Sequence, residues 1–218
     1  MQAQGVFHNQ KELASYVTKS GTAITINGQL PTLGDLRYED VNGDGRIDDN
    51  DRVFAGSYQP KYTLGFNGTI SYKAFDLGIG AYGTIGNKIY NGKKAARFNQ
   101  KDNVEASVAN NSWTFKNYAT NVPRANLNPI PQSTYFIESG DFARINNLTI
   151  GYTFPQTLLN KYGISNFRCY VTSQNLLTLT KYSGFTPEIE DGSPIAPGIE
   201  FNAYPTTRTY AFGVNLTF

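Results

Sequence analysis

The sequence is poor in the residues on which many catalytic and metal sites depend. Its 218 residues include one cysteine, Cys169, and one histidine, His8. A single cysteine excludes an internal disulfide and a cysteine-rich metal site, and a single histidine excludes a site that needs two. No acidic residue or serine stands in a pattern with a base partner, and no glycine-rich loop precedes a helix in a phosphate-binding pattern. The sequence therefore predicts a protein that is not an enzyme.

Long hydrophobic runs and an excess of one charge are also missing. No stretch approaches the roughly 18–20 apolar residues of a membrane-spanning helix. The mean hydropathy is −0.41, but this average does not exclude a membrane barrel, in which lipid-facing and lumen-facing residues alternate. The net charge of +2 gives no indication of nucleic-acid binding. Residues 1–20 lack the basic and apolar segments of a signal peptide.

Aromatic residues and glycine are frequent instead, with 15 Tyr, 14 Phe and 21 Gly. This composition favours β structure over helix. From Lys61 onward, apolar and polar residues alternate with a period of two, as they do in a strand with two different faces. Residues 62–72 and 75–85 predict two long strands joined by the tight turn Lys73-Ala74.

Three further strands are predicted, at residues 142–154, 167–179 and 208–218. In the first, the alternation slips at Asn146-Asn147, where a β-bulge would restore it. Pro155 ends that strand, and residues 156–165 predict a short turn with one helical turn closed by Gly163. A tilted strand needs about 9–11 residues to cross a bilayer, whereas the mean strand has about 5–6. The predicted lengths therefore fit membrane crossing.

The connections between these strands alternate between short and long. Short turns lie at 73–74 and 155–166, and long polar loops at 86–141 and 181–207. Outer-membrane barrels have short periplasmic turns and long extracellular loops. The sequence thus predicts an all-β fold: an antiparallel, up-and-down transmembrane β-barrel segment of about five long strands with long extracellular loops. The barrel is incomplete, because five strands cannot close one of transporter size. A soluble β-sandwich or lipocalin-like barrel is the alternative.

We divide the chain into an extracellular loop region, residues 1–60, and C-terminal barrel strands, residues 61–218. In the first region, Asn9 predicts the N-cap of a short helix over residues 10–17. In the second, the shared parity of the apolar residues predicts that one convex face of a curved sheet carries them. These residues are Leu64, Phe66, Ile70, Leu77, Ile79, Leu148, Ile150, Val171, Phe212, Val214 and Leu216.

Residues 40–51 match the spacing of a calcium-binding loop. Gly45 stands at the sixth position, where a sharp turn is needed, and the apolar Ile47 at the eighth. Oxygen ligands at alternate positions let a coiled loop wrap one hard cation, so we predict a structural calcium ion. An Asx-rich turn that binds nothing is the alternative. The predicted ligands are Asp40, Asn42, Asp44, the carbonyl of Arg46, Asp48 and Asp51.

The last strand ends on an aromatic residue. Its alternating apolar residues resemble the C-terminal signal of proteins that the outer-membrane assembly machinery inserts. An unpaired strand edge exposes N–H and C=O groups that an assembly factor can capture by strand addition. The predicted signal comprises Tyr210, Phe212, Val214, Leu216 and Phe218.

Several segments resemble SusC/RagA-type TonB-dependent transporters. The resemblance implies a large plugged barrel in the cell outer membrane, in contact with its lipid. It also implies import of glycans or peptides too large for porins, together with a SusD-like surface lipoprotein that closes over the mouth. Energy would come from TonB, acting on an N-terminal plug that this chain does not contain. The matching segments are 34–45 with Asp51-Arg52, Gln59-Pro60-Lys61-Tyr62, 141–152, 174–178, 181–185 with Pro187-Glu188, Tyr204-Pro205 and 212–218.

Two other functions compete with this interpretation. A soluble calcium-binding, β-rich adhesion module would share the acidic loop and the β content. It does not predict strands with one apolar face or a terminal Phe218. A secreted hydrolase would need an acid/base pair, and the sequence shows none.

Overall fold

The computed structural model describes residues 1–97, 103–125, 130–189, 197–201 and 203–218. It divides into two compact units, each assembled from separated segments. Unit 1 contains Met1–Gly56, Tyr90–Glu138 and Ile199–Asn202, and unit 2 contains Ser57–Ile89, Ser139–Gly198 and Ala203–Phe218. None of the helices in these described ranges is long and apolar enough to cross a membrane.

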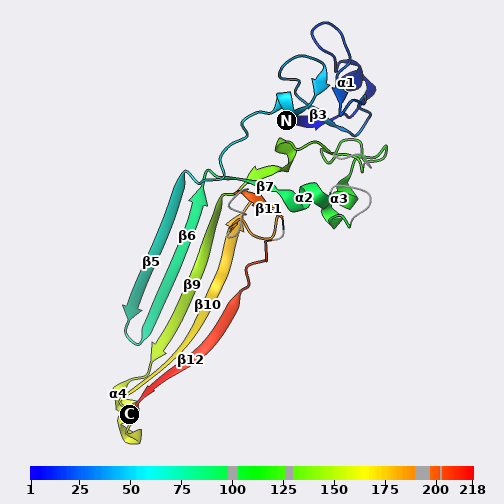
Figure 1. Cartoon of the computed structure of the whole chain (residues 1–218). Helices are drawn as coiled ribbons and strands as arrows, with labels where there is room; N and C mark the ends of the chain where they lie inside the picture. The colour runs from blue at the N-terminus through cyan, green and yellow to red at the C-terminus, as the bar shows by residue number, and fades with distance from the viewer. Residues whose placement is uncertain (98–102, 126–129, 190–196, 202) are drawn as a thin grey trace. The chain divides into compact units, whose positions relative to one another are not determined.

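Unit 2 is built on a five-stranded antiparallel sheet, with the strand order β12-β10-β9-β6-β5 (Figure 1). Each of these five long strands pairs with the previous and the next long strand along the chain, which confirms the predicted up-and-down order. The strand bounds agree with the predicted ones to within one residue. They are β5 Tyr62–Tyr72, β6 Phe75–Ile85, β9 Phe142–Thr153, β10 Asn166–Thr180 and β12 Thr209–Thr217.

The predicted bulge in β9 is present and keeps the apolar residues on one face. Gly80 of β6 faces Asn147, whereas the next residue, Ala81, faces Ile145, so Asn146 is the extra residue. On the other side of β9 the register with β10 shifts at the same level, between Gln174 and Leu177. Because side chains alternate strictly along a strand, the extra residue returns Ile145 to the face that Leu148 occupies.

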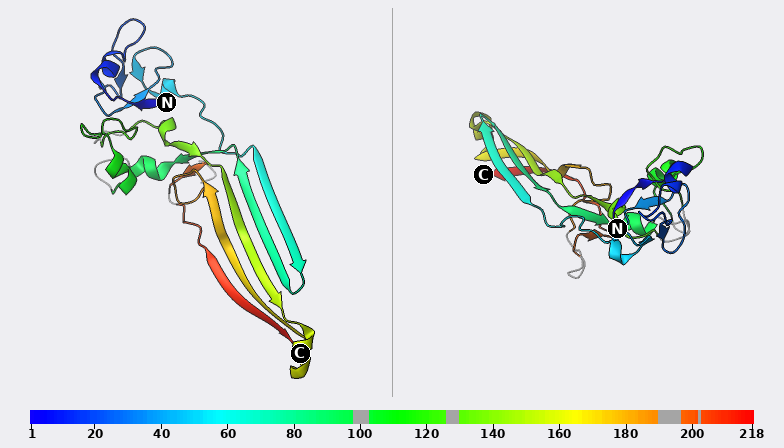
Figure 2. Two further views of the ribbon diagram at one scale, coloured as in Figure 1. Left: turned by 180° about the vertical axis from the view of Figure 1, so that it is seen from behind. Right: turned by 90° about the horizontal axis from the view of Figure 1, so that it is seen from above.

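The short connections lie together at one end of the sheet, with the C-terminus (Figure 1). Lys73 has a positive φ of 54°, as the tight turn between β5 and β6 requires. Between β9 and β10 lie α4 (Gln156–Leu159) and the 3-10 turn η3 (Asn160–Tyr162), closed by Gly163 in the left-handed conformation. The predicted helical turn is therefore confirmed. Figure 2 shows the curvature of the strands from behind and from above.

Unit 1 has its own hydrophobic core. Tyr16 donates a hydrogen bond from its hydroxyl to the carbonyl oxygen of Tyr38, at 2.7 Å. Burial raises the pKa of Tyr16 to about 12 and also raises the pKa of Tyr38, because the charged phenolate loses its hydration there. The buried residues of the core are Val6, Phe7, Tyr16, Ile24, Leu36, Tyr38, Ile47 and Trp113.

Short elements surround this core. The helix α1 (Gln10–Ala14) has the predicted cap, because Asn9 accepts a hydrogen bond from the amide of Glu12, but it ends three residues before the predicted Val17. The other elements of residues 1–60 are β1 Ala3–Val6, β2 Thr25–Ile26, β3 Leu36–Tyr38, β4 Arg46–Ile47 and η1 Asp49–Asp51.

Residues 86–141, predicted as a long loop with no clear period, contain several short elements. Trp113 and Phe136 are buried single aromatic residues that anchor the segment without any repeating pattern. Such isolated anchors explain why periodicity did not indicate structure here. The elements are β7 Lys88–Asn91, α2 Gly92–Arg97, α3 Ala106–Asn111, η2 Thr134–Phe136 and β8 Ile137–Ser139; β11 (Ile199–Glu200) pairs with β7.

Candidate functional site

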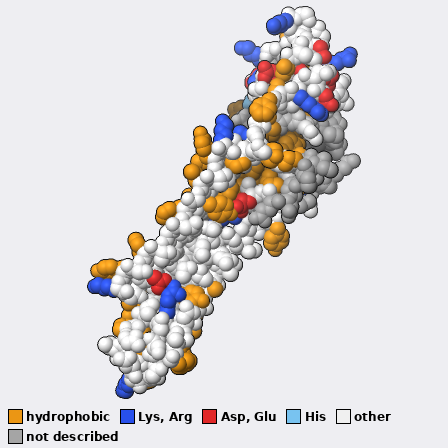
Figure 3. Space-filling model, turned by 60° about the vertical axis from the view of Figure 1, so that its left-hand side comes forward, with side chains coloured by type: hydrophobic (Ala, Val, Ile, Leu, Met, Phe, Trp, Pro, Cys, Tyr) orange, Lys and Arg blue, Asp and Glu red, His pale blue; other side chains and the backbone are white. Residues whose placement is uncertain are grey.

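One face of the five-stranded sheet carries exposed apolar side chains on every strand. Figure 3 shows hydrophobic side chains projecting along the margin of the sheet, beside a surface of other side chains and backbone. A single row of paired residues crosses the whole sheet, and its outer members, Ile70 and Phe212, are 69% and 71% exposed. The complete row is Ile70, Leu77, Ile150, Val171 and Phe212. Of the residues predicted for this face, only Ile79 and Leu148 are half-buried and the rest are exposed. An exposed apolar surface that continues across five strands marks a contact with a membrane or another protein.

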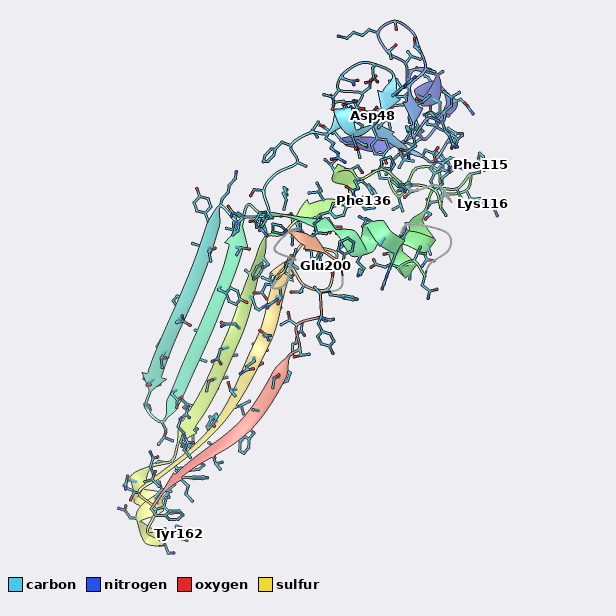
Figure 4. The ribbon with its side chains drawn as sticks, viewed as in Figure 1. Asp48, Phe115, Lys116, Phe136, Tyr162 and Glu200 are labelled. Atoms are coloured by element: carbon cyan, nitrogen blue, oxygen red, sulfur yellow. The ribbon has the colours of Figure 1, made fainter. Side chains whose placement is uncertain are left out.

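Aromatic rings gather where the short connections lie. Phe75 and Tyr152 face each other on neighbouring strands, with ring centroids 4.8 Å apart. Phe154 stacks on Phe167 at the same centroid distance. Tyr162 of η3 is exposed at this end of the sheet (Figure 4). Aromatic residues at the edge of an apolar band are typical of the interfacial girdle of a membrane barrel.

The opposite face of the sheet is polar and carries an ion pair near the short connections. Arg168 contacts Asp76 through two nitrogen–oxygen pairs of 2.9 and 2.5 Å. The pair crosses over Gly151, where a Cβ atom would lie 2.4 Å from both side chains. Beside it, the ring of Tyr170 occupies the space over Gly213 in the same way. The glycines of this face therefore make room for the larger polar side chains of neighbouring strands.

A second polar cluster lies on the same face, toward the long connections. Tyr82, Arg144 and Thr178 are directly paired on β6, β9 and β10. Arg144 forms an ion pair with Glu188, which also accepts a hydrogen bond from the hydroxyl of Tyr82. Neither ion pair was predicted from the sequence, although Asp76, Arg144 and Arg168 are charged residues among the small residues of the polar face.

The six predicted calcium ligands lie in one loop between β3 and the end of η1. Asp40 accepts hydrogen bonds from the amides of Gly43 and Gly45, at 2.8 and 3.0 Å. Asp44 accepts one from the amide of Arg46, at 2.8 Å. Each bond uses one carboxylate oxygen, which retains further lone pairs. The six predicted ligand atoms are all oxygens, which is the ligand type that calcium prefers, so the residue types fit the predicted cation.

Asp51 joins the two ends of this loop. Its carboxylate is fully buried and accepts the amide of Val41 at 2.8 Å and that of Asp48 at 2.9 Å. Figure 4 shows Asp48 in its place in the loop. Among the residues with described positions, no three His, Cys, Asp or Glu side chains converge as a metal site. Calcium therefore remains a prediction.

Tyr210, Phe212, Val214 and Leu216 of the predicted assembly signal share one face of β12, and Phe218 directly follows the strand. All five are exposed, and the terminal Phe218 is 82% exposed. In the described part of the chain β12 pairs only with β10, so its other edge is open. This geometry is the one that capture by strand addition needs, although the recognition itself remains a prediction.

Comparisons with known proteins agree with this geometry. No family model matches the sequence. The chain is 33% identical over 204 residues to TonB-dependent receptor P3 of Formosa agariphila, which covers 91% of this chain and 20% of that receptor. It is 28% identical over 184 residues to TonB-dependent receptor SusC of Bacteroides thetaiotaomicron, which covers 83% of this chain and 17% of that receptor.

A solved structure of the RagAB peptide transporter matches the chain with a TM-score of 0.69 and 26% identity, over 85% of this chain and 21% of that one. The chain thus spans about a fifth of the length of the curated relatives it matches. The sequence aligns with these receptors along most of its length, and the five-stranded sheet aligns to part of the RagA barrel. The chain therefore belongs to the SusC/RagA family of TonB-dependent receptors, which are outer-membrane transport proteins and not enzymes.

Proposed function

We propose that this chain forms the C-terminal strands of the barrel of an outer-membrane importer for nutrients too large for porins. The observation that carries the proposal is the five-stranded sheet with an exposed apolar row on one face and ion pairs on the other. In a membrane barrel the apolar face contacts lipid and the polar face lines the lumen. The short connections and Phe218 then lie on the periplasmic side and the long connections outside.

We further propose that a SusD-like lipoprotein covers the mouth and that TonB supplies the energy through a plug encoded outside this chain. The likeness to the RagAB peptide transporter supports a two-protein importer and makes peptides one candidate cargo. The likeness to SusC supports the same family plan. Glycans are the other candidate cargo.

Uptake by cells that carry the full-length transporter tests the proposal. Fluorescent oligopeptides and fluorescent oligosaccharides are the probes, and deletions of the transporter, the neighbouring lipoprotein and TonB are the comparisons. We expect accumulation of one probe class that all three deletions reduce. Accumulation that is the same with and without the transporter would contradict the importer function, and copurification would test the lipoprotein separately.

We also propose that the loop at residues 40–51 binds calcium as a structural ion. The spacing of its oxygen donors and the packing of Ile47 in the core of unit 1 support the proposal. A bound ion would reduce the repulsion between the carboxylates of the loop and hold its coiled backbone. Its role would be stability and not catalysis.

A further inference from the structure

We propose that residues 182–189 form a fixed strap along the polar face of the sheet, and that the ion pair between Arg144 and Glu188 sets how far this strap narrows the mouth of the transporter. The inference rests on the proposed function, because the polar face is the lumenal face only in a closed barrel. Within that function, Arg144 and Glu188 would determine the size of cargo that can enter.

The anchor on the sheet is a buried arginine. Arg144 has a side chain that is only 3% exposed. Its Nε atom donates to the hydroxyl of Thr178 at 2.8 Å, and its guanidinium lies 5.6 Å from the centre of the Phe142 ring. These contacts fix the side chain but do not neutralise its charge. A buried charge without a counter-ion is strongly unfavourable.

The strap supplies that counter-ion. Glu188 forms the ion pair with Arg144 and accepts the hydroxyl of Tyr82, so both of its carboxylate oxygens bind the sheet. Its own side chain is 18% exposed. Moving the strap away would remove the counter-ion and the hydrogen-bond acceptor that Arg144 and Tyr82 have in the folded sheet. The ion pair therefore holds the strap in one position.

The strap has an ordered structure of its own. Tyr182 and Thr186 are buried, and the amide of Glu188 donates to the hydroxyl of Thr186 at 3.2 Å. Gly184 packs under the ring of Tyr182, where a Cβ atom would lie 2.3 Å from the ring. Because these contacts are internal to the strap, we expect the strap to keep its own structure if it leaves the sheet.

The strap does not lie flat on the sheet. A cavity of about 430 Å³ lies beside the contact through Glu188, lined by Thr63, Thr84 and Phe142 of the sheet, by Pro187 and Glu188 of the strap, and by neighbouring connections such as Tyr58 and Lys88. The strap thus stands off the wall and occupies space that would otherwise belong to the lumen. Releasing it would widen the passage and open this cavity.

The same face offers a matched control. The pair between Asp76 and Arg168 also joins an acid to an arginine, but it connects two strands, six residues along β6 from the Tyr82 that contacts the strap. Asp76→Asn and Glu188→Gln each replace one carboxylate by an amide of equal size. A general loosening of the barrel would follow from both substitutions, whereas release of the strap would follow only from Glu188→Gln.

The test labels a cysteine in the cavity of the intact, full-length transporter on cells that lack the lipoprotein. In a background with Cys169→Ala and Thr84→Cys, maleimide–polyethylene glycol reagents of increasing mass are added outside. We expect Glu188→Gln to accelerate labelling by the large reagents several-fold and to leave labelling by the smallest reagent unchanged. Asp76→Asn should label like the parent.

Equal labelling of the parent and Glu188→Gln by the large reagents would overturn the strap, as would an equal acceleration by Asp76→Asn. If Glu188→Gln does not reach the surface, Tyr82→Phe serves instead, because it removes one of the two contacts between Glu188 and the sheet and should accelerate labelling by the large reagents to a smaller extent. Surface levels of the parent test barrel assembly independently. If the parent assembles in the outer membrane but Glu188→Gln does not change its labelling, the strap is rejected and the proposed function is unaffected.

Discussion

Phe218 directly follows β12, one face of which carries exposed apolar residues along the whole strand. If the assembly machinery recognises this face, deleting Phe218 from the full-length protein should sharply reduce insertion into the outer membrane of cells. Refolding in detergent should change little, because one exposed aromatic residue contributes only about 1.5–3 kcal/mol through burial in lipid. Surface labelling and detergent refolding measure the two effects. Normal surface levels of the deletion variant would leave Phe218 with a packing role alone.

The central acid of the calcium-type loop gives a second test. Asp44→Ala removes one proposed ligand and also the acceptor for the amide of Arg46. Isothermal calorimetry on the intact transporter should detect calcium binding that this substitution weakens. Asp49→Ala is the control, because Asp49 is outside the predicted ligand set and pairs with Arg52. Identical calcium titrations for the parent and Asp44→Ala would count against the site.

The ionisation of Tyr16 should make the stability of unit 1 depend on pH in the alkaline range. Its pKa is raised from 10 to about 12, so the unfolded chain loses this proton before the folded one. The stabilisation is therefore complete below about pH 10 and disappears as the pH rises to about 12. Proteolysis of the intact transporter with a protease active in alkali should begin to cut residues 1–56 in that window.

Tyr16→Phe in the same experiment should weaken the core at neutral pH by about 1 kcal/mol, because its hydrogen bond to Tyr38 is lost. Tyr118→Phe changes an exposed tyrosine and is the control. Cleavage rates for Tyr16→Phe that equal the parent at neutral pH would show that the hydrogen bond does not stabilise unit 1.

The same charge should destabilise the barrel on one face of β10 and have little effect on the other. Val171 lies in the apolar row and Gln174 on the polar face, and both are exposed. Val171→Arg places a charge toward lipid and should destabilise the barrel, by less than the roughly 2–4 kcal/mol expected at the middle of the bilayer, because its row lies two residues from the paired Phe75 and Tyr152. Gln174→Arg places it toward the lumen and should have little effect. Urea unfolding of the full-length protein in lipid vesicles compares them, and equal losses would contradict the assignment of faces.

Alternation predicted the sheet well because it is a local property of the chain. Each long strand was recognisable from its own residues, and even the bulge at Asn146 appeared as a slip in the pattern. The elements between Asn87 and Asp141 were not predicted, since they depend on single buried anchors such as Trp113 and Phe136. The helix after Asn9 was found through its cap, but its end depends on packing that the local sequence does not encode.

The polar contacts of the sheet were harder to predict than its strands. Asp76 and Arg168 are far apart in sequence, and their pairing follows only from the register of β6, β9 and β10. The partner of Arg144 lies outside the strands altogether, in a loop that folds back. A charge among glycines and threonines indicates that a partner must exist, but the alternation of residues cannot identify it.

At the scale of the whole molecule, the sheet has two edge strands, β5 and β12, that each pair on one side only among the residues the structure describes. Together with the apolar row, these edges predict that the 218-residue chain expressed alone will not be a water-soluble monomer. Sedimentation after expression at low level should find it in the insoluble or membrane fraction, whereas we expect the full-length protein to refold in detergent. A soluble, monomeric chain with a cooperative thermal transition would instead favour the adhesion module.

The bulge at Asn146 also limits how a family built on this sheet can vary in length. One residue gained or lost within β9 would turn every side chain beyond it to the opposite face, unless β6 and β10 shifted at the same level. Such an exchange would turn polar side chains toward lipid, which is unfavourable. In the long connections the side chains do not alternate between two faces, so a change in length has no such effect. Insertions and deletions among homologues should therefore fall between the strands, in 86–141 and 181–207, so that cargo range diversifies in the loops while strand lengths stay constant.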